Sequence, residues 1–139
     1  MCARECSQEV PLSSRRAVVT DGAPKALGPY AQGVVVGNTL YVSGQIGLEP
    51  STGRLVGGGV VAETEQVLEN LLAVIHAAGF TRGDVVKTTI YVTGLAHSRA
   101  VNDVYGRYFR EPYPARATVE VAALPNGARV EIEAVAVRS

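Results

Sequence analysis

Residues 113–119 read YPARATV and place one arginine among small and apolar residues of the kind that build a strand. A guanidinium keeps its charge inside a protein, so an inward-facing arginine needs an anionic partner. Strand periodicity puts Arg116, Thr118 and Glu120 on one face, with Ala117 and its apolar neighbours on the other, and the apolar face is expected to receive the helices. The partner of Arg116 is either a carboxylate of the protein or the anion of a bound ligand, and the residues alone leave both interpretations open.

A second candidate lies in the last predicted strand, where acidic residues alternate with apolar ones. Glu131 shares a face with Arg129 and Glu133, and the apolar face opposite them is expected to receive the helices. In a simple hairpin with its loop at residues 125–128, Arg116 and Glu131 would lie roughly 20 Å apart, at about 3.3 Å per residue. An ion pair across such a hairpin is therefore disfavoured. The two residues share a site only if the strands are arranged otherwise or a neighbouring subunit contributes.

Four further positions carry weaker signals. A glycine–proline pair predicts a turn that presents Tyr30, and Ser43 and Gly44 fall at a strand end, where backbone N–H groups can face a ligand. Ordinary loop structure is the simpler explanation of both segments. Asn102 lies beside the apolar stripe of a predicted helix, where a buried amide needs hydrogen-bond partners, so a helix-packing contact is the alternative to a role in a site.

The sequence predicts neither a metal site nor an organic cofactor. Cys2, Cys6, His76 and His97 are too scattered along the chain for a four-ligand zinc site, and two reduced thiols are expected. No glycine-rich phosphate loop, Cys–His nucleophile pair or HExxH motif is present. His76 is expected on the solvated side of a helix.

The composition predicts one self-associating domain. A chain of 139 residues supports a single core, and we expect residues 1–15 to form a flexible tail and residues 16–139 the domain. Thirteen basic against 13 acidic residues give a net charge of zero, which weighs against nucleic acid and anionic membrane as partners. The 47% hydrophobic content against 19% charged residues favours a subunit interface. No run of about 20 apolar residues occurs, so a cytoplasmic location is expected, with the mitochondrion as the alternative.

Two periodicities place the helices and strands. Apolar residues spaced from Val60 to Ala78 predict a helix that stops at Gly79, and Ser98 is expected to cap a second helix. Strands are predicted near residues 18–19, on both sides of a turn at 37–38, and at 84–92, 115–123 and 129–137. The order is β-β-β-α-β-α-β-β, an α+β domain with two helices on one face of a sheet.

Six segments, in this order, resemble the reactive-intermediate deaminase A family, RidA, also called YjgF: GPYAQG, YVSGQIG, VVKTTIYV, VNDVYGRYF, PARATVEVAALP and VEIEAVAV. The resemblance covers about residues 18–138. It implies a chorismate-mutase-like fold with a mixed sheet, assembled as a homotrimer whose clefts lie between subunits. It also implies hydrolysis of enamines and imines such as 2-aminoacrylate, 2-iminopropanoate and related 2-imino acids to 2-oxo acids and ammonia, with no cofactor or metal.

The resemblance assigns roles to the candidate residues. Arg116 would bind the substrate carboxylate and polarise the C=N carbon, and Glu131 would activate the attacking water. The main chain around Ala117 and Thr118 would hold the water or the leaving amine. The remaining cleft positions are Tyr30, Ser43, Gly44 and Asn102.

Two departures from the family pattern bear on specificity. Thr118 replaces a cysteine found in many members, and His97–Ser98 replaces an acidic–aromatic pair. The alternative functions are RNA cleavage with translation inhibition, or a non-catalytic chaperone-like or ligand-sensing trimer.

Overall fold

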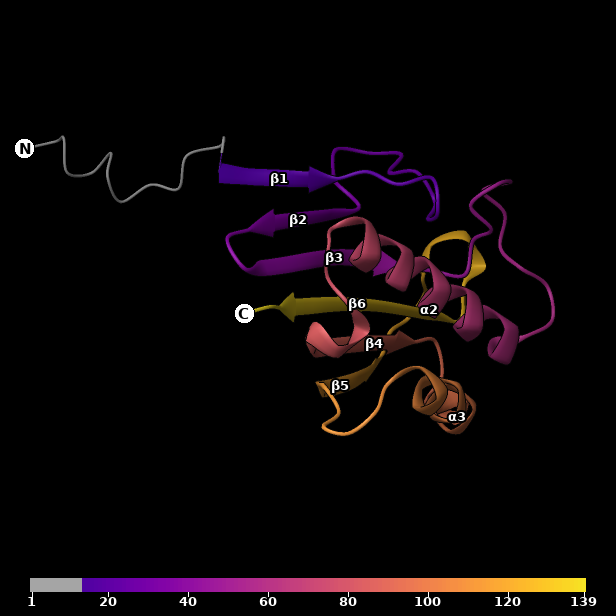
Figure 1. Ribbon diagram of the computed structural model, residues 1–139. Coiled ribbons are helices and arrows are strands. Elements are labelled where there is room, and N and C mark those ends of the chain that lie inside the picture. The colour runs from indigo at the N-terminus through magenta and orange to yellow at the C-terminus, as the bar shows by residue number, and fades with distance from the viewer. Residues whose placement is uncertain (1–13) are drawn as a thin grey trace, which may run out of the picture.

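The computed structural model of the chain describes residues 14–139 (Figure 1). Cys2, Cys6 and most of the predicted tail lie outside the described residues. The first strand, β1 (Arg15–Val18), begins three residues earlier than expected. Val19, predicted inside a strand, follows it and is 85% exposed. β1 therefore includes Arg15, the last residue of the predicted tail.

Six strands form one mixed sheet in the order β1-β2-β3-β6-β4-β5 (Figure 1). All neighbouring pairs are antiparallel except β4 and β5, which run parallel. The predicted tight turn at Gly37 joins β2 and β3, and its φ of 59° is one that glycine tolerates best. The strands after β1 are β2 (Gly33–Val36), β3 (Thr39–Gln45), β4 (Val85–Val92), β5 (Ala115–Glu120) and β6 (Val130–Val137).

Two helices cover one face of this sheet, as the apolar spacing predicted (Figure 1). The longer helix, α2 (Val60–Ala77), buries its apolar stripe and is followed by Gly79 at φ 87°, which ends it. The shorter helix is α3 (Ser98–Tyr108). Ser98 was predicted to be its cap, but it is the first helical residue, and the capping position belongs to His97 without a side-chain hydrogen bond. His76 is exposed, as expected.

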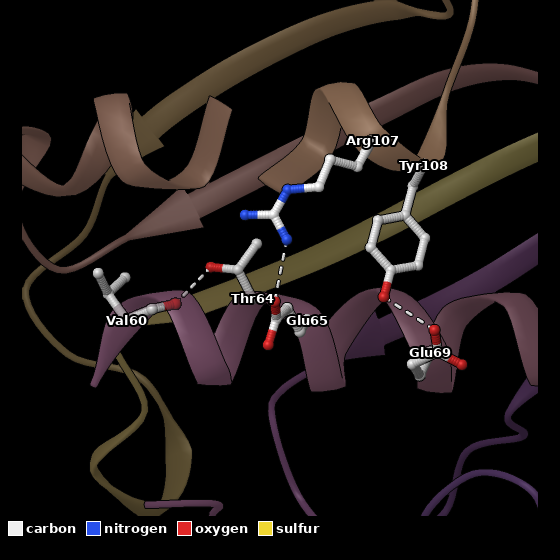
Figure 2. Close-up of polar contacts among 6 residues, drawn as sticks. All are labelled: Val60, Thr64, Glu65, Glu69, Arg107 and Tyr108. Carbon is white, nitrogen blue, oxygen red and sulfur yellow. Dashed lines mark hydrogen bonds and ion pairs between the residues drawn. The ribbon is translucent and has the colours of Figure 1, made fainter. Parts of the chain in front are cut away.

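Side chains of the two helices also bond to each other at the solvent edge (Figure 2). Arg107 of α3 pairs with Glu65 of α2 at 3.1 Å, and the Tyr108 hydroxyl donates to Glu69 at 2.8 Å. Burial raises the pKa of Tyr108 to about 12, and its hydrogen bond to Glu69 adds to the effect. The phenol is therefore a neutral donor at physiological pH. These contacts set the position of α3 over the end of the sheet.

The prediction of which face of β5 meets the helices was wrong. Arg116 lies level with Thr88 of β4, and Thr88 is 1% exposed beneath α3. The Glu120 carboxylate, on the same face, accepts the N–H of Leu95 just before α3 at 2.9 Å. The polar face of β5 therefore points toward α3, and Val119, 42% exposed, lies on the uncovered face. β5 is an edge strand, and there the helices no longer cover the sheet completely.

β5 and β6 are not a hairpin, because β4 lies between them. The expectation that Arg116 and Glu131 do not pair across a simple hairpin is therefore confirmed. On β6 the expected orientation is also confirmed, since Val130, Ile132 and Ala134 are buried toward the helices.

Candidate functional site

Glu131 is held over a glycine on the uncovered face of the sheet. The apolar neighbours of Glu131 along β6 are buried toward the helices, so its own side chain projects from the opposite face. The β3–β6 register shifts between Val42 and Gln45, so that two residues of β3, Ser43 and Gly44, lie opposite the single residue Glu133 of β6. A Cβ atom at Gly44 would lie 2.9 Å from the Glu131 carboxyl carbon, so that any side chain here would displace the carboxylate. Glycine at position 44 therefore makes room for the carboxylate.

The carboxyl group of Glu131 holds its proton more tightly than an ordinary one. Burial raises the pKa of Glu131, and the negative charge of Glu133 on the same face raises it further. A carboxylate of raised pKa is a stronger base once ionised. Tyr91, which lies level with Glu131 on β4, also has a raised pKa, through burial first and then the charge of Glu133.

Hydrogen bonds tie the segment before β2 to the sheet beside this carboxylate. The Gln32 side chain donates to three carbonyls of residues 20–24, at 3.0, 3.3 and 2.8 Å, and accepts one N–H at 2.8 Å. The Ser43 hydroxyl donates to the carbonyl of Ala31 at 2.5 Å. Ser43 thereby fixes the chain next to Tyr30, and its hydroxyl is occupied in that contact rather than directed at a ligand.

Tyr30, Gly44 and Glu131 line one cavity of about 460 Å³. Lys25 also contributes to the wall, and Tyr30 is 57% exposed at its side. The rest of the wall comes from Pro24, Leu27 and Gln32 and from parts of segments 45–53 and 125–126. Three of the predicted site residues therefore line the same cavity, and Ser43 stabilises the segment that carries Tyr30.

Arg116 and Asn102 line a different cavity, of about 350 Å³, at the edge of the sheet. Tyr105, Tyr113 and Pro114 form most of the remaining wall. Asn102 is exposed on α3 rather than buried, and within residues 14–139 its amide makes no helix-packing hydrogen bond. The side chain is therefore free to face the cavity.

No carboxylate in the described part of the chain pairs with Arg116. The two ion pairs found there join Arg107 to Glu65 and Arg129 to Glu63. The Arg116 guanidinium instead lies over the ring of Tyr105, with Cζ 5.0 Å from the ring centroid. The sequence left two possible partners for Arg116, a carboxylate of the protein or the anion of a ligand. A carboxylate partner within residues 14–139 is not observed.

The two cavities are far apart within one chain. Arg116 is level with Thr88 of β4, whereas Glu131 is level with Tyr91, three residues further along. That offset is about 10 Å along the strand, and two strand spacings add about 9.5 Å across the sheet. The two side chains also project from opposite faces. A ligand of a few atoms cannot touch both groups in a single chain.

Ala117 and Thr118 lie on the same edge strand as Arg116. Ala117 is exposed on the uncovered face, and Thr118 is half-buried toward the helices. β5 is the last strand in the sheet, so half of its backbone N–H and C=O groups have no strand neighbour. The main chain here is able to hydrogen-bond a ligand or a second chain.

Two residues that support the candidates were not found from the sequence. Tyr105 belongs to the buried stripe of α3, and its spacing of three residues from Asn102 indicates that the two share a helix face. Glu63, fully buried in α2, accepts the N–H of Arg129 at 2.8 Å and pairs with its guanidinium. This contact anchors the start of β6 next to Glu131. Its partners are 66 residues apart, and no local pattern could have indicated the pairing.

Residues 14–139 contain no group of three or more His, Cys, Asp or Glu side chains placed to hold a metal ion. In the same part of the chain, no helix is long and apolar enough to cross a membrane.

Comparison with known proteins gives close relatives. A family model described as Endoribonuclease L-PSP matches residues 20–138. Human 2-iminobutanoate/2-iminopropanoate deaminase is 49% identical over 124 residues, which is 89% of this chain and 90% of the human protein. The crystal structure of RidA from an Antarctic Psychrobacter has 47% identity and a TM-score of 0.86, with 88% of this chain and 99% of that one covered. E. coli TdcF, crystallised with bound serine, has 42% identity and a TM-score of 0.85, with 89% and 99% covered.

Proposed function

Since this chain belongs to the Endoribonuclease L-PSP family, which includes YjgF and RidA, we propose that it is a hydrolytic deaminase of 2-imino acids. The substrates would be 2-iminopropanoate, 2-iminobutanoate and the enamines that tautomerise to them. The observation that carries the proposal is a pair of complementary half-sites, one with an arginine that has no carboxylate partner in residues 14–139 and one with a carboxylate of raised pKa. The name of the human relative supports the choice of substrate.

Arg116 would bind the carboxylate of the imino acid. Its planar fork matches a carboxylate in a bidentate way, and its fixed charge draws electron density from the adjacent C=N carbon. Asn102 and the main chain of Ala117 and Thr118 lie beside it to hold the nitrogen or the water. The guanidinium therefore orients the substrate and makes its imine carbon more electrophilic.

Glu131 would act as the general base. It takes a proton from water while the water oxygen bonds to the imine carbon, and the C=N electrons move to nitrogen, which takes a proton from solvent. In the resulting carbinolamine, protonated Glu131 gives its proton to the amine nitrogen. The hydroxyl oxygen then re-forms a double bond to carbon as its proton passes to solvent, the C–N bond breaks, and ammonia leaves. The sum is imino acid plus water giving 2-oxo acid plus ammonia. A raised pKa helps Glu131 in the first step and lets it return the proton in the second.

We propose that a second copy of the chain brings the two half-sites together. Arg116 lies on the sheet edge and Glu131 on the uncovered face, so copies packed around a threefold axis can place one chain's Arg116 against the next chain's Glu131. The uncovered face carries exposed apolar side chains suited to an interface. They include Tyr41 at 53%, Val119 at 42% and Val137 at 42% exposure. A homotrimer with three such clefts follows.

RNA cleavage and non-catalytic sensing remain outcomes of the test rather than parts of the proposal. The family model carries the word endoribonuclease in its description. However, the chain has no net charge to supply the electrostatic attraction that RNA binding usually uses. The expected cytoplasmic location stays a prediction.

The proposal is tested by generating imino acids in the cuvette with an amino-acid oxidase and following release of 2-oxo acid and ammonia. Wild type should accelerate release, and both Arg116→Ala and Glu131→Gln should abolish the acceleration. Matched controls are Arg110→Ala, an exposed arginine in the neighbouring cavity, and Glu133→Gln, the adjacent carboxylate on the same face. Both controls should retain most of the activity. If wild type gives no acceleration with any imino acid, the deaminase proposal is wrong, and RNA cleavage and ligand sensing become the functions to test.

A further inference from the structure

Arg116 has an unusual setting for a binding arginine. Within residues 14–139 no carboxylate holds its guanidinium, and the residue is exposed on an edge strand. A long side chain in that position would ordinarily sample many rotamers and lose that freedom on binding a ligand. A contact that already restricts the Arg116 side chain before binding would reduce this loss and favour binding of the substrate carboxylate.

The ring of Tyr105 is in the right place to do so. The Arg116 Cζ atom lies over this ring, 5.0 Å from the centroid, within the range of a cation–π contact. A guanidinium held through its face keeps its N–H donors at the edge, where they can reach a carboxylate. Tyr105 also lines the same cavity as Arg116.

Tyr105 is itself fixed from two sides. Its hydroxyl shares a hydrogen bond of 2.7 Å with the Thr88 hydroxyl beneath α3, in a buried setting. On the other side, the Phe109 ring lies 4.7 Å from the Tyr105 ring, centroid to centroid, tilted by 39°. Tyr105 is only 5% exposed. The ring is therefore a rigid platform rather than a mobile side chain.

The protonation state of Tyr105 argues against a role in proton transfer. Burial raises its pKa, against smaller lowering effects of the Thr88 hydrogen bond and the Arg116 charge. The phenol stays neutral at physiological pH, and its hydroxyl is engaged with Thr88 rather than with the cavity. Tyr105 is placed to orient Arg116, not to transfer a proton.

We propose that Tyr105 is a positioning residue whose ring preorganises the Arg116 guanidinium for a substrate carboxylate. The proposal rests on the proposed function for the identity of the ligand, but the contact itself does not depend on catalysis. The aromatic ring is the part that matters, and the hydroxyl serves to anchor it. Phenylalanine at this position should therefore preserve binding, whereas an aliphatic residue should weaken it.

The test compares Tyr105→Phe and Tyr105→Leu, with Phe80→Leu as the matched control. Phe80 is a buried aromatic ring that contacts a different arginine, Arg138, whose Cζ lies 4.5 Å from the ring centroid. Calorimetry measures the Kd of 2-oxobutanoate, a carboxylate that needs no turnover, and the deaminase assay gives KM and kcat. All variants are first checked for folding by circular dichroism and for assembly by gel filtration.

Tyr105→Leu is expected to raise both Kd and KM about 2- to 30-fold, the range of a cation–π contact, with kcat changed less than threefold. Tyr105→Phe and Phe80→Leu should stay within about twofold of wild type, although Phe80→Leu lowers the melting temperature. In an Arg116→Ala background, Tyr105→Leu should add no further loss. An equal rise of Kd in Phe80→Leu, or an additive loss in the Arg116→Ala, Tyr105→Leu double variant, overturns the proposal.

A spectroscopic readout covers the case in which 2-oxobutanoate does not bind. In NMR spectra of the wild type and Tyr105→Phe, the Arg116 Nε–H resonance should be shifted upfield by the ring current, and in Tyr105→Leu it should not. An unshifted wild-type resonance overturns the positioning role whatever the activity. If the shift and the Arg116-dependent binding are present but no imine is hydrolysed, the proposed function fails and the positioning role stands.

Discussion

Gly44→Ala should inactivate the site with little effect on folding. The new Cβ would lie 2.9 Å from the Glu131 carboxyl carbon and 3.2 Å from its Cγ. Carbon atoms pack at about 3.5 to 4.0 Å, so the end of the Glu131 side chain must retreat by roughly 0.5 to 1 Å. A misplacement of about 1 Å in a catalytic group lowers rates on the order of 100-fold, and that is the expected fall in kcat/KM.

The cost in stability should be small for two reasons. The clashing atoms belong to the end of a side chain at the wall of a cavity, which can move without repacking the core. The backbone of Gly44 is also outside the left-handed region, so alanine is allowed there, and loss of glycine's freedom in the unfolded chain offsets part of the cost. The free energy of unfolding should change by less than about 1 kcal/mol.

The assay is imine hydrolysis, paired with urea denaturation of each variant. Gly57→Ala is the matched control, because a Cβ there meets nothing within 4 Å and the backbone is likewise compatible. It should leave both activity and stability unchanged. Adding Gly44→Ala to Glu131→Gln should cost little more than Glu131→Gln alone. Full activity in Gly44→Ala would refute the placement of Glu131 as the base.

The other predictions concern charge and anchoring. Glu133→Gln should lower the pKa of Glu131, because it removes the negative charge that raises it. Since the base must be ionised, the acidic limb of the pH–rate profile should move to lower pH. A limb that stays in place or moves to higher pH contradicts this prediction. Glu63→Gln breaks the buried ion pair at the start of β6 and should lower the free energy of unfolding by about 2 kcal/mol, measured by urea denaturation. An unchanged free energy of unfolding would show that the carboxylate is dispensable. Tyr108→Phe should cost about 1 kcal/mol at pH 7, through loss of the hydrogen bond to Glu69 (Figure 2). The raised pKa of Tyr108 means that the wild-type advantage is complete below about pH 10 and is lost as the pH rises toward 12, and a difference that persists there contradicts the assignment.

Local patterns determined most of the fold. The spacing of apolar residues in α2 and the turn chemistry at Gly37 depend only on neighbours along the chain, and both are found as predicted. The cap at Ser98 failed because His97 already continues a short helical turn from Leu95, so the chain needs no side-chain cap there. Boundaries of this kind depend on what precedes the helix.

The orientation of β5 could not be inferred from alternation alone. Alternation gives two faces, but an edge strand at the margin of the helical layer has polar residues on the covered side and apolar ones on the open side. Arg116 faces α3 because Tyr105 and the cavity lie there, whereas Val119 lies on the face available to another chain. The apolar face of β5 would be buried only if the proposed second copy of the chain packs against it.

The relation between Arg116 and Glu131 is likewise not local. It depends on the insertion of β4 between β5 and β6 and on a parallel pairing, neither of which leaves a mark in the two segments themselves. The residues nonetheless indicated correctly that a simple hairpin would keep the two groups apart. Hydrogen-bonding supports such as Glu63, distant in sequence from their partners, left no signal at all.

The most direct measurement of the central claim, a site shared between two copies, is complementation. Arg116→Ala and Glu131→Gln proteins, each inactive alone, are co-expressed or refolded together in equal amounts and assayed for imine hydrolysis. If each cleft takes Arg116 from one subunit and Glu131 from the next, random trimers contain about a quarter of intact clefts, and about a quarter of wild-type activity should return. If the mixed trimers form and no activity returns, the two residues do not act across a subunit interface, and the account is wrong.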